Sequence, residues 1–425
     1  MYTLGSRRRR TSPRRVLLLL ILIGAGVFVI INQNQLRQQL VPPPTPTATR
    51  TARSYVVEAE SLYEAGNVPA TIDAYVQAVS LDPQNVDVLI KLSRLLVLRG
   101  RTVEGVRYAE RAAQAAPKNV PAQAALAMAY DWHGSRLQQR GRELEAGDFF
   151  QKAIAAGKTA VTLDGTYAEA HAYLAETYAD LSSWESATDR AQQALDLDAN
   201  RADVQRALAY VRESQGNYSG AVEAYERAIQ LAPREVNLYV ALGQDYRVLT
   251  DWPKAIDAFE RATKIDPAYV AGFDDLGWTH YLIEDFKQAE RILEQAIKID
   301  PTAWSPRSHL AATYFVRKNY EDAATTFKTA IELMNTDFDA DRYCVVAKTR
   351  ACDRVVVAYA TMAVSNCYLA EAYNDPSKYE QVALPAFRRA LTIRPDDEGV
   401  LSNMDFCQRV MGKPPFRTPT PQPFK

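Results

Sequence analysis

The chain has 425 residues, a formal net charge of −1 and 24% charged residues. A nearly neutral balance argues against a general nucleic-acid surface, which is usually strongly basic. The chain has only four histidines and four cysteines, and it has no CxxC pair, HExxH motif or glycine-rich phosphate loop. We therefore expect no cofactor, no metal site, no nucleic-acid partner and no enzymatic activity.

A basic N-terminus precedes an apolar segment. Residues 1–15 carry six arginines, and residues 16–31 carry no charge. As a helix those 16 residues span about 24 Å, so continuation to residue 33 or local thinning is needed to cross a core of about 30 Å. A cleaved signal peptide is the alternative, but no small-x-small cleavage site follows the apolar run. We predict an uncleaved single-pass signal-anchor over 16–33, with residues 1–15 in the cytoplasm and the rest of the chain outside it.

Two short segments are rich in proline and threonine. Residues 34–51 include the run VPPPTPTATRT, and residues 412–425 end in PPFRTPTPQPFK. Such composition favours an extended chain without a packed core. We interpret the first segment as a linker and the second as a disordered tail.

The remaining residues, 52–411, repeat every 34 positions. Within 236–269, two apolar stripes with helical spacing are separated by Thr250-Asp251, and Pro267 ends the second stripe. Neither helix can bury its stripe alone, so successive pairs must stack. Two columns of alanine recur in phase, at positions 187, 221, 255, 289 and 323 and at positions 194, 228, 262, 296 and 330.

The period and the small-residue columns resemble those of the tetratricopeptide repeat (TPR) family. The resemblance implies an all-α superhelical solenoid of about nine helix-turn-helix repeats. Two places depart from the period: an insertion near 131–147, where we expect longer helices, and an insertion near 336–363. Residues 396–411 are expected to form a final helix that caps the last apolar face.

The four cysteines lie near the C-terminus. Cys344 and Cys352 fall in the same insertion, whereas Cys367 and Cys407 fall on neighbouring helices. If the solenoid is extracytoplasmic, these two pairs are disulfide candidates. The alternative is four reduced, buried thiols.

TPR domains, by resemblance, bind peptides or protein surfaces in the concave groove lined by the first helix of each repeat. The candidate partner-binding residues occupy positions of that helix that are not needed for packing. These are Tyr173, Arg206, Tyr210, Gln244, Arg247, Asp274, Trp278, Tyr281 and Phe315.

We therefore predict a membrane-tethered scaffold or adaptor that binds proteins or extended peptides. A membrane-anchored chaperone for exported chains is one alternative, and a homo-oligomerising component of a larger assembly is another. An enzyme is a third alternative. Its one candidate catalytic residue is His133, which lies beside Asp131 and Trp132.

Overall fold

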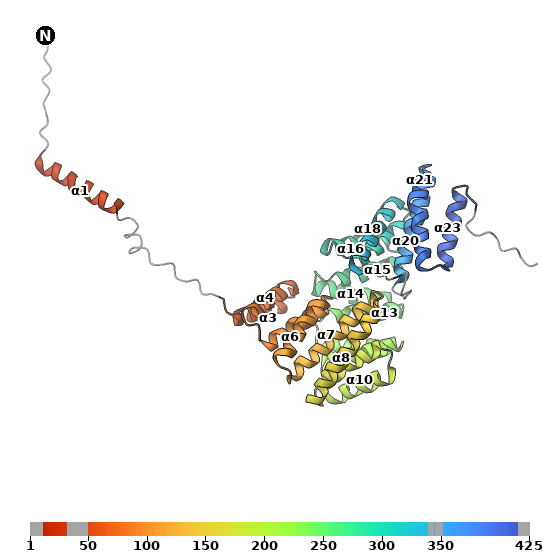
Figure 1. The fold of residues 1–425 in the computed structure, drawn as a ribbon, viewed down its shortest axis with the longest axis horizontal. Helices are drawn as coiled ribbons and strands as arrows, with labels where there is room; N and C mark the ends of the chain where they lie inside the picture. The colour runs from red at the N-terminus through yellow and green to blue at the C-terminus, as the bar shows by residue number, and fades with distance from the viewer. Residues whose placement is uncertain (1–11, 32–49, 339–343, 345–351, 415–425) are drawn as a thin grey trace, which may run out of the picture. The chain divides into compact units, whose positions relative to one another are not determined.

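A computed structural model describes residues 12–31, 50–338, 344 and 352–414. The chain divides into two compact units, Met1–Thr51 and Ala52–Lys425. In the described ranges, all regular secondary structure is helical, which confirms the predicted fold class (Figure 1). The arginines at 7–10, most of the 34–51 linker and residues 415–425 of the tail lie outside the described residues.

The first unit contains helix α1, Pro13–Ile31, whose side chains are all exposed. It has 19 residues and a mean hydropathy of 2.5. At 1.5 Å per residue it is about 28 Å long, close to the thickness of a hydrocarbon core. By length and composition this helix can cross a membrane, and a signal sequence passes the same test.

The second unit begins with a series of antiparallel helical pairs, which Figure 1 follows from α3 to α18. Within each pair the two helices pack on one another, and each second helix packs on the first helix of the next pair. The pairs are α3 (Ala52–Glu64) with α4 (Val68–Leu81), α5 (Val86–Leu98) with α6 (Thr102–Ala115), α7 (Val120–Gln139) with α8 (Glu143–Leu163), α9 (Ala168–Asp180) with α10 (Trp184–Asp198), α11 (Ala202–Ser214) with α12 (Tyr218–Leu231), α13 (Val236–Val248) with α14 (Trp252–Ile265), α15 (Val270–Leu282) with α16 (Phe286–Ile299), and α17 (Trp304–Val316) with α18 (Tyr320–Phe338).

The turn inside each pair has the same geometry. One residue adopts a positive φ, as Gly66 does at 78° and Thr250 does at 61°. The next residue is the N-cap of the second helix, and there Asn67 and Asp251 accept a hydrogen bond from a backbone amide of the first turn. A left-handed residue followed by an N-cap reverses the chain in two positions.

The alanine columns account for the close approach of the helices. All ten alanines are fully buried. Larger side chains from the facing helix fill the space around them. The ring of Phe259 lies so close to Gly243 that a Cβ there would come within 2.6 Å of it. The small residues therefore define where the helices touch.

The extra residues of the third pair lengthen its helices. α7 has 20 residues and α8 has 21, whereas α9 and α11 each have 13. Phe150 of α8 is buried against Gly134 of α7 in the added turns. Apolar packing thus continues to the end of the pair, and only a short turn separates its helices.

The C-terminal region differs from the expectation. The ninth pair begins with α20, Cys352–Ala372, which is 21 residues long and mostly buried. Residues 352–363, assigned above to an insertion, form the first half of this helix because the run VVVAYATMAV packs into the C-terminal core. Residues 339–343 and 345–351 of that insertion lie outside the described residues. The region continues with α21 (Pro376–Lys378), the π-helical segment η1 (Tyr379–Ala383), α22 (Leu384–Ile393) and the capping helix α23 (Glu398–Val410).

Two disulfides hold this region together. One joins Cys344 to Cys352, and the other joins Cys367 of α20 to Cys407 of α23. All four cysteines are buried. The second bridge attaches the capping helix to the core helix of the ninth pair.

Candidate functional site

The first helices of the middle pairs surround a cavity of about 490 Å³, which we call the groove cavity. Its lining comes from α5, α7, α9, α11, α13 and α15, with single contributions from α6 and α12. Among the lining residues, Gly100, Arg136 and Gln139 are exposed and mark its mouth. The charged lining residues are Asp131, Arg136, Glu176, Asp180, Arg206, Glu213 and Asp275.

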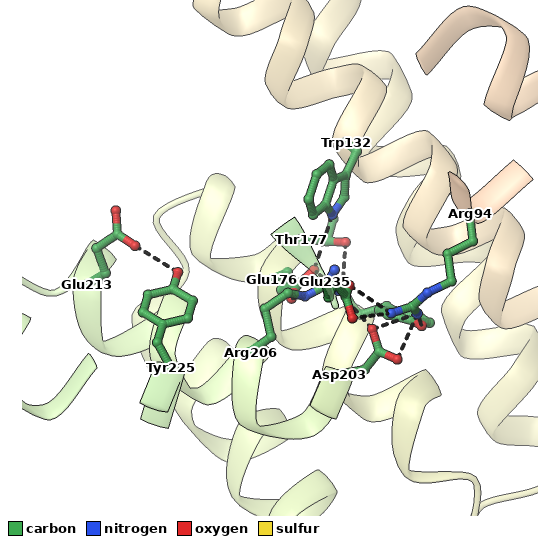
Figure 2. A network of polar contacts seen from close by, with 10 residues as sticks. Arg94, Trp132, Glu176, Thr177, Asp203, Arg206, Glu213, Tyr225 and Glu235 are labelled. Atoms are coloured by element: carbon green, nitrogen blue, oxygen red, sulfur yellow. Dashed lines mark hydrogen bonds and ion pairs between the residues drawn. The ribbon is translucent and has the colours of Figure 1, made fainter. Parts of the chain in front are cut away.

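A cluster of ion pairs crosses the groove beside this cavity (Figure 2). Arg94 of α5 donates to both carboxylate oxygens of Asp203 at 2.8 and 2.7 Å and to those of Glu235 at 2.9 and 3.1 Å. It also donates to the Tyr173 hydroxyl at 3.2 Å. Burial opposes the charge on Arg94, but the two carboxylates raise the pKa of its guanidinium well above the ordinary value. Arg94 therefore joins the second pair to the fifth and sixth pairs.

A second contact across the groove lies nearby. Arg99, just after α5, forms an ion pair with Asp266 and donates to the Ala268 carbonyl oxygen at 3.2 Å. Its guanidinium also lies 5.6 Å from the centre of the Tyr269 ring. These contacts link the second pair to the start of the seventh.

The floor of the groove cavity contains a buried ion pair. Arg206 donates two hydrogen bonds of 3.1 Å to Glu176, and both side chains are 4% exposed. The guanidinium of Arg206 lies 5.2 Å from the centre of the Trp132 ring and 5.8 Å from that of Tyr173. Burial raises the pKa of Glu176 to about 7, although Arg206 opposes the rise.

Two further carboxylates of the lining, Asp180 and Glu213, have hydroxyl partners, and a third, Asp131, has an oxygen that is unpartnered within the described residues. Asp180 accepts hydrogen bonds from Ser135 and Tyr210, and Glu213 accepts one from Tyr225 at 2.9 Å. Asp131 is 2% exposed, and its Oδ1 has no hydrogen-bond partner in the described part of the chain.

The environment of these three groups favours their neutral forms. Burial and the charges of Asp180 and Glu176 raise the pKa of Asp131 well above its ordinary value. Burial also raises the pKa of Asp180 and of Glu213. The groove cavity is thus lined by three acidic groups to which the described residues give no cationic hydrogen-bond partner.

The candidate partner-binding residues fall into three places. Arg206, Tyr210 and Gln244 line the groove cavity, and Tyr173 is buried beside it in the ion-pair cluster. Arg247 lies one turn beyond Gln244, and both donate to Asp275, at 2.8 and 3.0 Å. Of these five residues, Tyr173 and Arg206 are almost fully buried, and the other three are half-buried.

A separate aromatic cluster lies on α15 and α17. The ring of Trp278 stacks on Tyr281, with centroids 4.5 Å apart, and on His309 at 4.3 Å. Asp274 fixes the histidine through a 2.7 Å contact to Nδ1 and accepts a 2.6 Å hydrogen bond from Ser305. Trp278 and Tyr281 are half-buried, so part of each ring faces solvent.

Phe315 lies apart from the other candidates. Its ring meets that of Tyr320 edge-on at 5.7 Å, and it packs against the C-terminal core. Its position in the repeat is the same as that of Arg247 and Tyr281, but its apolar neighbours give it a packing role.

His133, the place at which we considered catalysis, is a packed side chain. Its Nδ1 lies 2.9 Å from the Thr102 hydroxyl, and its ring contacts Phe149 edge-on at 4.5 Å. Burial lowers the pKa of the imidazole. In the described residues, no group of three or more histidine, cysteine or acidic side chains could hold a metal ion.

Sequence reasoning missed Arg94, Asp203 and Glu235, because their contact spans 109 to 141 positions. It also missed Asp245, although the pattern of residues at this repeat position could have identified it. Thr177, Thr279 and Thr313 occupy the same place in their helices, and each donates to the carbonyl oxygen four residues earlier. Asp245 is an acid in this threonine column, it is 1% exposed, and burial raises its pKa to about 8.

Two family models that match the chain have the same description. One family model described as tetratricopeptide repeat matches residues 62–129 and 284–341, and a second with the same description matches residues 202–245. No curated protein sequence matches the chain.

Many solved structures resemble the chain. A thermophilic TPR protein of Thermus thermophilus is 22% identical, over 46% of this chain and 98% of that one, with a TM-score of 0.39. Pseudomonas aeruginosa pilF is 16% identical, over 56% and 96%, with a TM-score of 0.44. A tetratricopeptide repeat protein from Parabacteroides merdae is 15% identical, over 62% and 98%, with a TM-score of 0.39.

Proposed function

Because the chain belongs to the tetratricopeptide repeat family, we propose that it is a membrane-anchored adaptor that binds segments of partner proteins in its groove. Proteins of this family are generally scaffolds for protein interaction, and their fold is typically non-catalytic. The finer parts of the proposal are the anchor, the side of the membrane and the binding surface.

The groove cavity is the observation that carries the proposal. Six successive first helices contribute to one cavity of about 490 Å³, within the range of sites that enclose small ligands or short peptide segments. Aromatic and arginine side chains, the residue types that dominate protein interfaces, lie in and beside it. Beyond it, the half-buried Trp278 and Tyr281 extend the same kind of surface along α15.

The anchor is supported by α1. This helix leaves all its apolar side chains exposed, and water solvates such a surface poorly. Insertion into a bilayer would bury the whole surface. A helix of 19 residues with mean hydropathy 2.5 has the dimensions required.

An extracytoplasmic position of the repeats is supported from both ends of the chain. Arginines at 7–10, 14 and 15 precede the apolar run, and such basic flanks stay in the cytoplasm. The disulfides Cys344–Cys352 and Cys367–Cys407 require an oxidising compartment to persist. Protease treatment of sealed membranes tests the topology: digestion of the repeats from the cytoplasmic face would contradict it.

Affinity capture tests the adaptor itself. The full chain, purified in detergent, is incubated with solubilised membrane and envelope proteins from its source. The proposal predicts one or two partners at fixed stoichiometry, lost when Trp278 is replaced by alanine. Capture of many unrelated unfolded chains would instead identify a tethered chaperone, and capture of nothing but the chain itself would identify a self-assembling component.

A further inference from the structure

We propose that the groove cavity binds a positively charged side chain, arginine or lysine, presented by an extended segment of a partner protein. The inference rests on the proposed function and names the chemistry of the partner. The charge of the lining, one unpartnered oxygen and the shape of the cavity all favour such a ligand.

The charge of the lining is negative. Five carboxylates and two guanidiniums face the cavity, a formal charge of 2 − 5 = −3. Glu176 is neutralised by Arg206, and Asp275 by Arg247. Asp131, Asp180 and Glu213 remain, and the partners that the described residues give them are hydroxyl groups. Burial favours the neutral forms of these three groups, but a cation placed among them would favour their ionised forms and be attracted by all three.

Asp131 supplies the observation that points to a ligand. Its side chain is 2% exposed, it lines the cavity, and its Oδ1 accepts no hydrogen bond from the described residues. Burying a carboxylate oxygen without a hydrogen-bond donor destabilises the fold. An ammonium or guanidinium group has several N–H donors and no acceptor, so it can donate a hydrogen bond to this oxygen.

Arg206 must be weighed on the other side, because its Nη1 also lacks a hydrogen-bond partner among the described residues. An anion could approach that nitrogen. However, the charge of Arg206 is already balanced by Glu176 and by Asp203, 3.4 Å away. An anion would keep Asp131 and Asp180 protonated, whereas a cation would be bound by their ionised forms. The lining therefore favours a cation.

The shape of the cavity fits a side chain entering from solvent. The mouth at Gly100, Arg136 and Gln139 is exposed, whereas Val97 is buried and apolar. The guanidinium of Arg136 opposes the entry of a cation, but the three carboxyl groups of the lining that lack a cationic partner outnumber it. An apolar wall leading to buried carboxylates suits the long methylene stem and polar head of arginine or lysine. The hydroxyl-bearing rings of Tyr210 and Tyr225 add aromatic surface near the charge.

The test is calorimetric titration of the full chain in detergent with two peptides. The probe is acetyl-Gly-Ser-Arg-Ser-Gly-amide, and its control carries citrulline, which has nearly the same shape without the charge. We expect the arginine peptide to bind at least tenfold more tightly. Equal binding, or no binding of either peptide, would overturn the inference. Spermidine binding as tightly as the arginine peptide would overturn the assignment to a partner protein.

Two variants complete the test. Asp131→Asn removes the charge at nearly constant shape, and we expect at least tenfold weaker binding of the arginine peptide with unchanged helicity by circular dichroism. Glu223→Gln, an exposed residue of α12, is the matched control and should bind as the unmodified chain does. If Asp131→Asn fails to fold, Asp180→Asn replaces it with the same expectation. Unaltered binding by the cavity variant would contradict the inference.

Affinity capture separates this inference from the function on which it rests. If partners are captured but their binding ignores the charge of Asp131, the adaptor function stands and the cationic ligand is wrong. If no partner is captured and neither peptide binds, both are wrong.

Discussion

Arg94 donates hydrogen bonds to both carboxylate oxygens of Glu235, at 2.9 and 3.1 Å, across 141 positions of sequence. With Asp203 on the same guanidinium, this contact makes the second helical pair part of the wall that faces the fifth and sixth. A solenoid stabilised by neighbouring repeats alone would have no such contact. A few polar side chains therefore hold together repeats that lie far apart in the sequence.

Replacing Arg94 with methionine should loosen the groove. Asp203 and Glu235 would lose their shared cation, at a cost of about 1.5–3 kcal/mol for hydrogen bonds to charged groups. We expect faster amide hydrogen exchange in α5, α11 and α13, measured by mass spectrometry. Arg101→Met is the control, because Arg101 pairs with Glu104, an exposed residue three positions away. Equal protection in the two variants would show that the cluster does not hold the groove.

Replacing Asp245 with threonine should stabilise the solenoid, and more so at high pH. The pKa of Asp245 is about 8 in the folded chain against an ordinary 3.8, so the folded state holds a proton that the unfolded state releases. Stability therefore falls as pH rises from about 4 to 8. Each pKa unit corresponds to about 1.4 kcal/mol, so this loss is on the order of a few kcal/mol.

Urea unfolding at pH 5 and pH 8.5 measures the effect. The midpoint of Asp245→Thr should exceed that of the unmodified chain at pH 8.5, with a smaller difference at pH 5. The threonine hydroxyl can bond to the carbonyl oxygen of Ala241, as Thr279 does to that of Asp275. Thr279→Asp is the reciprocal control and should destabilise. If the increase in the urea midpoint were the same at both pH values, the charge of the Asp245 carboxylate would not be the cause of the increase.

Trp278→Ala should weaken partner binding at least tenfold without loss of helicity. The ring stacks on Tyr281 and His309, and its removal leaves those rings half-exposed but does not break the alanine columns that hold the helices together. Half-buried aromatic side chains of this kind dominate binding energy at interfaces. Trp184→Ala, at the start of α10 and 41% exposed, is the control and should bind normally. The prediction fails if both variants bind alike.

Replacing Cys367 with serine should release the capping helix. A disulfide that closes a loop of about 40 residues contributes about 4 kcal/mol by the chain-entropy relation. We expect rapid limited proteolysis within α23, while α3 to α18 stay intact. The Cys344–Cys352 bridge closes a much shorter loop, so its removal should have a smaller effect. Intact mass of the unreduced protein with four free thiols would contradict both bridges.

The sequence predicts the parts of this fold that repeat. A period of 34 places Ala187 and Ala221 in the same environment, and helical spacing identifies the buried face, because local packing in a solenoid depends on neighbouring repeats. The period does not predict that residues 352–363 belong to α20, because it breaks there, although their run of apolar residues is typical of a core helix.

The groove was predicted less completely. The repeat register identified Arg206, Tyr210 and Gln244, which line the cavity. It could not identify Arg94 with Asp203, since the superhelical path that brings these residues together depends on small angles summed over several repeats. It did not single out Asp131 as a lining residue, although Asp131 is the twelfth residue of α7, the position that Arg247 has in α13.

Site-specific crosslinking in native membranes tests the central claim most directly. A photoreactive amino acid replaces Gln139 at the mouth of the groove cavity in one variant, and Glu223 on the exposed face of α12 in another. We predict crosslinks from position 139 to a small, reproducible set of proteins and few from position 223. Equal crosslinking from both positions, or none from position 139, would contradict a partner-binding groove.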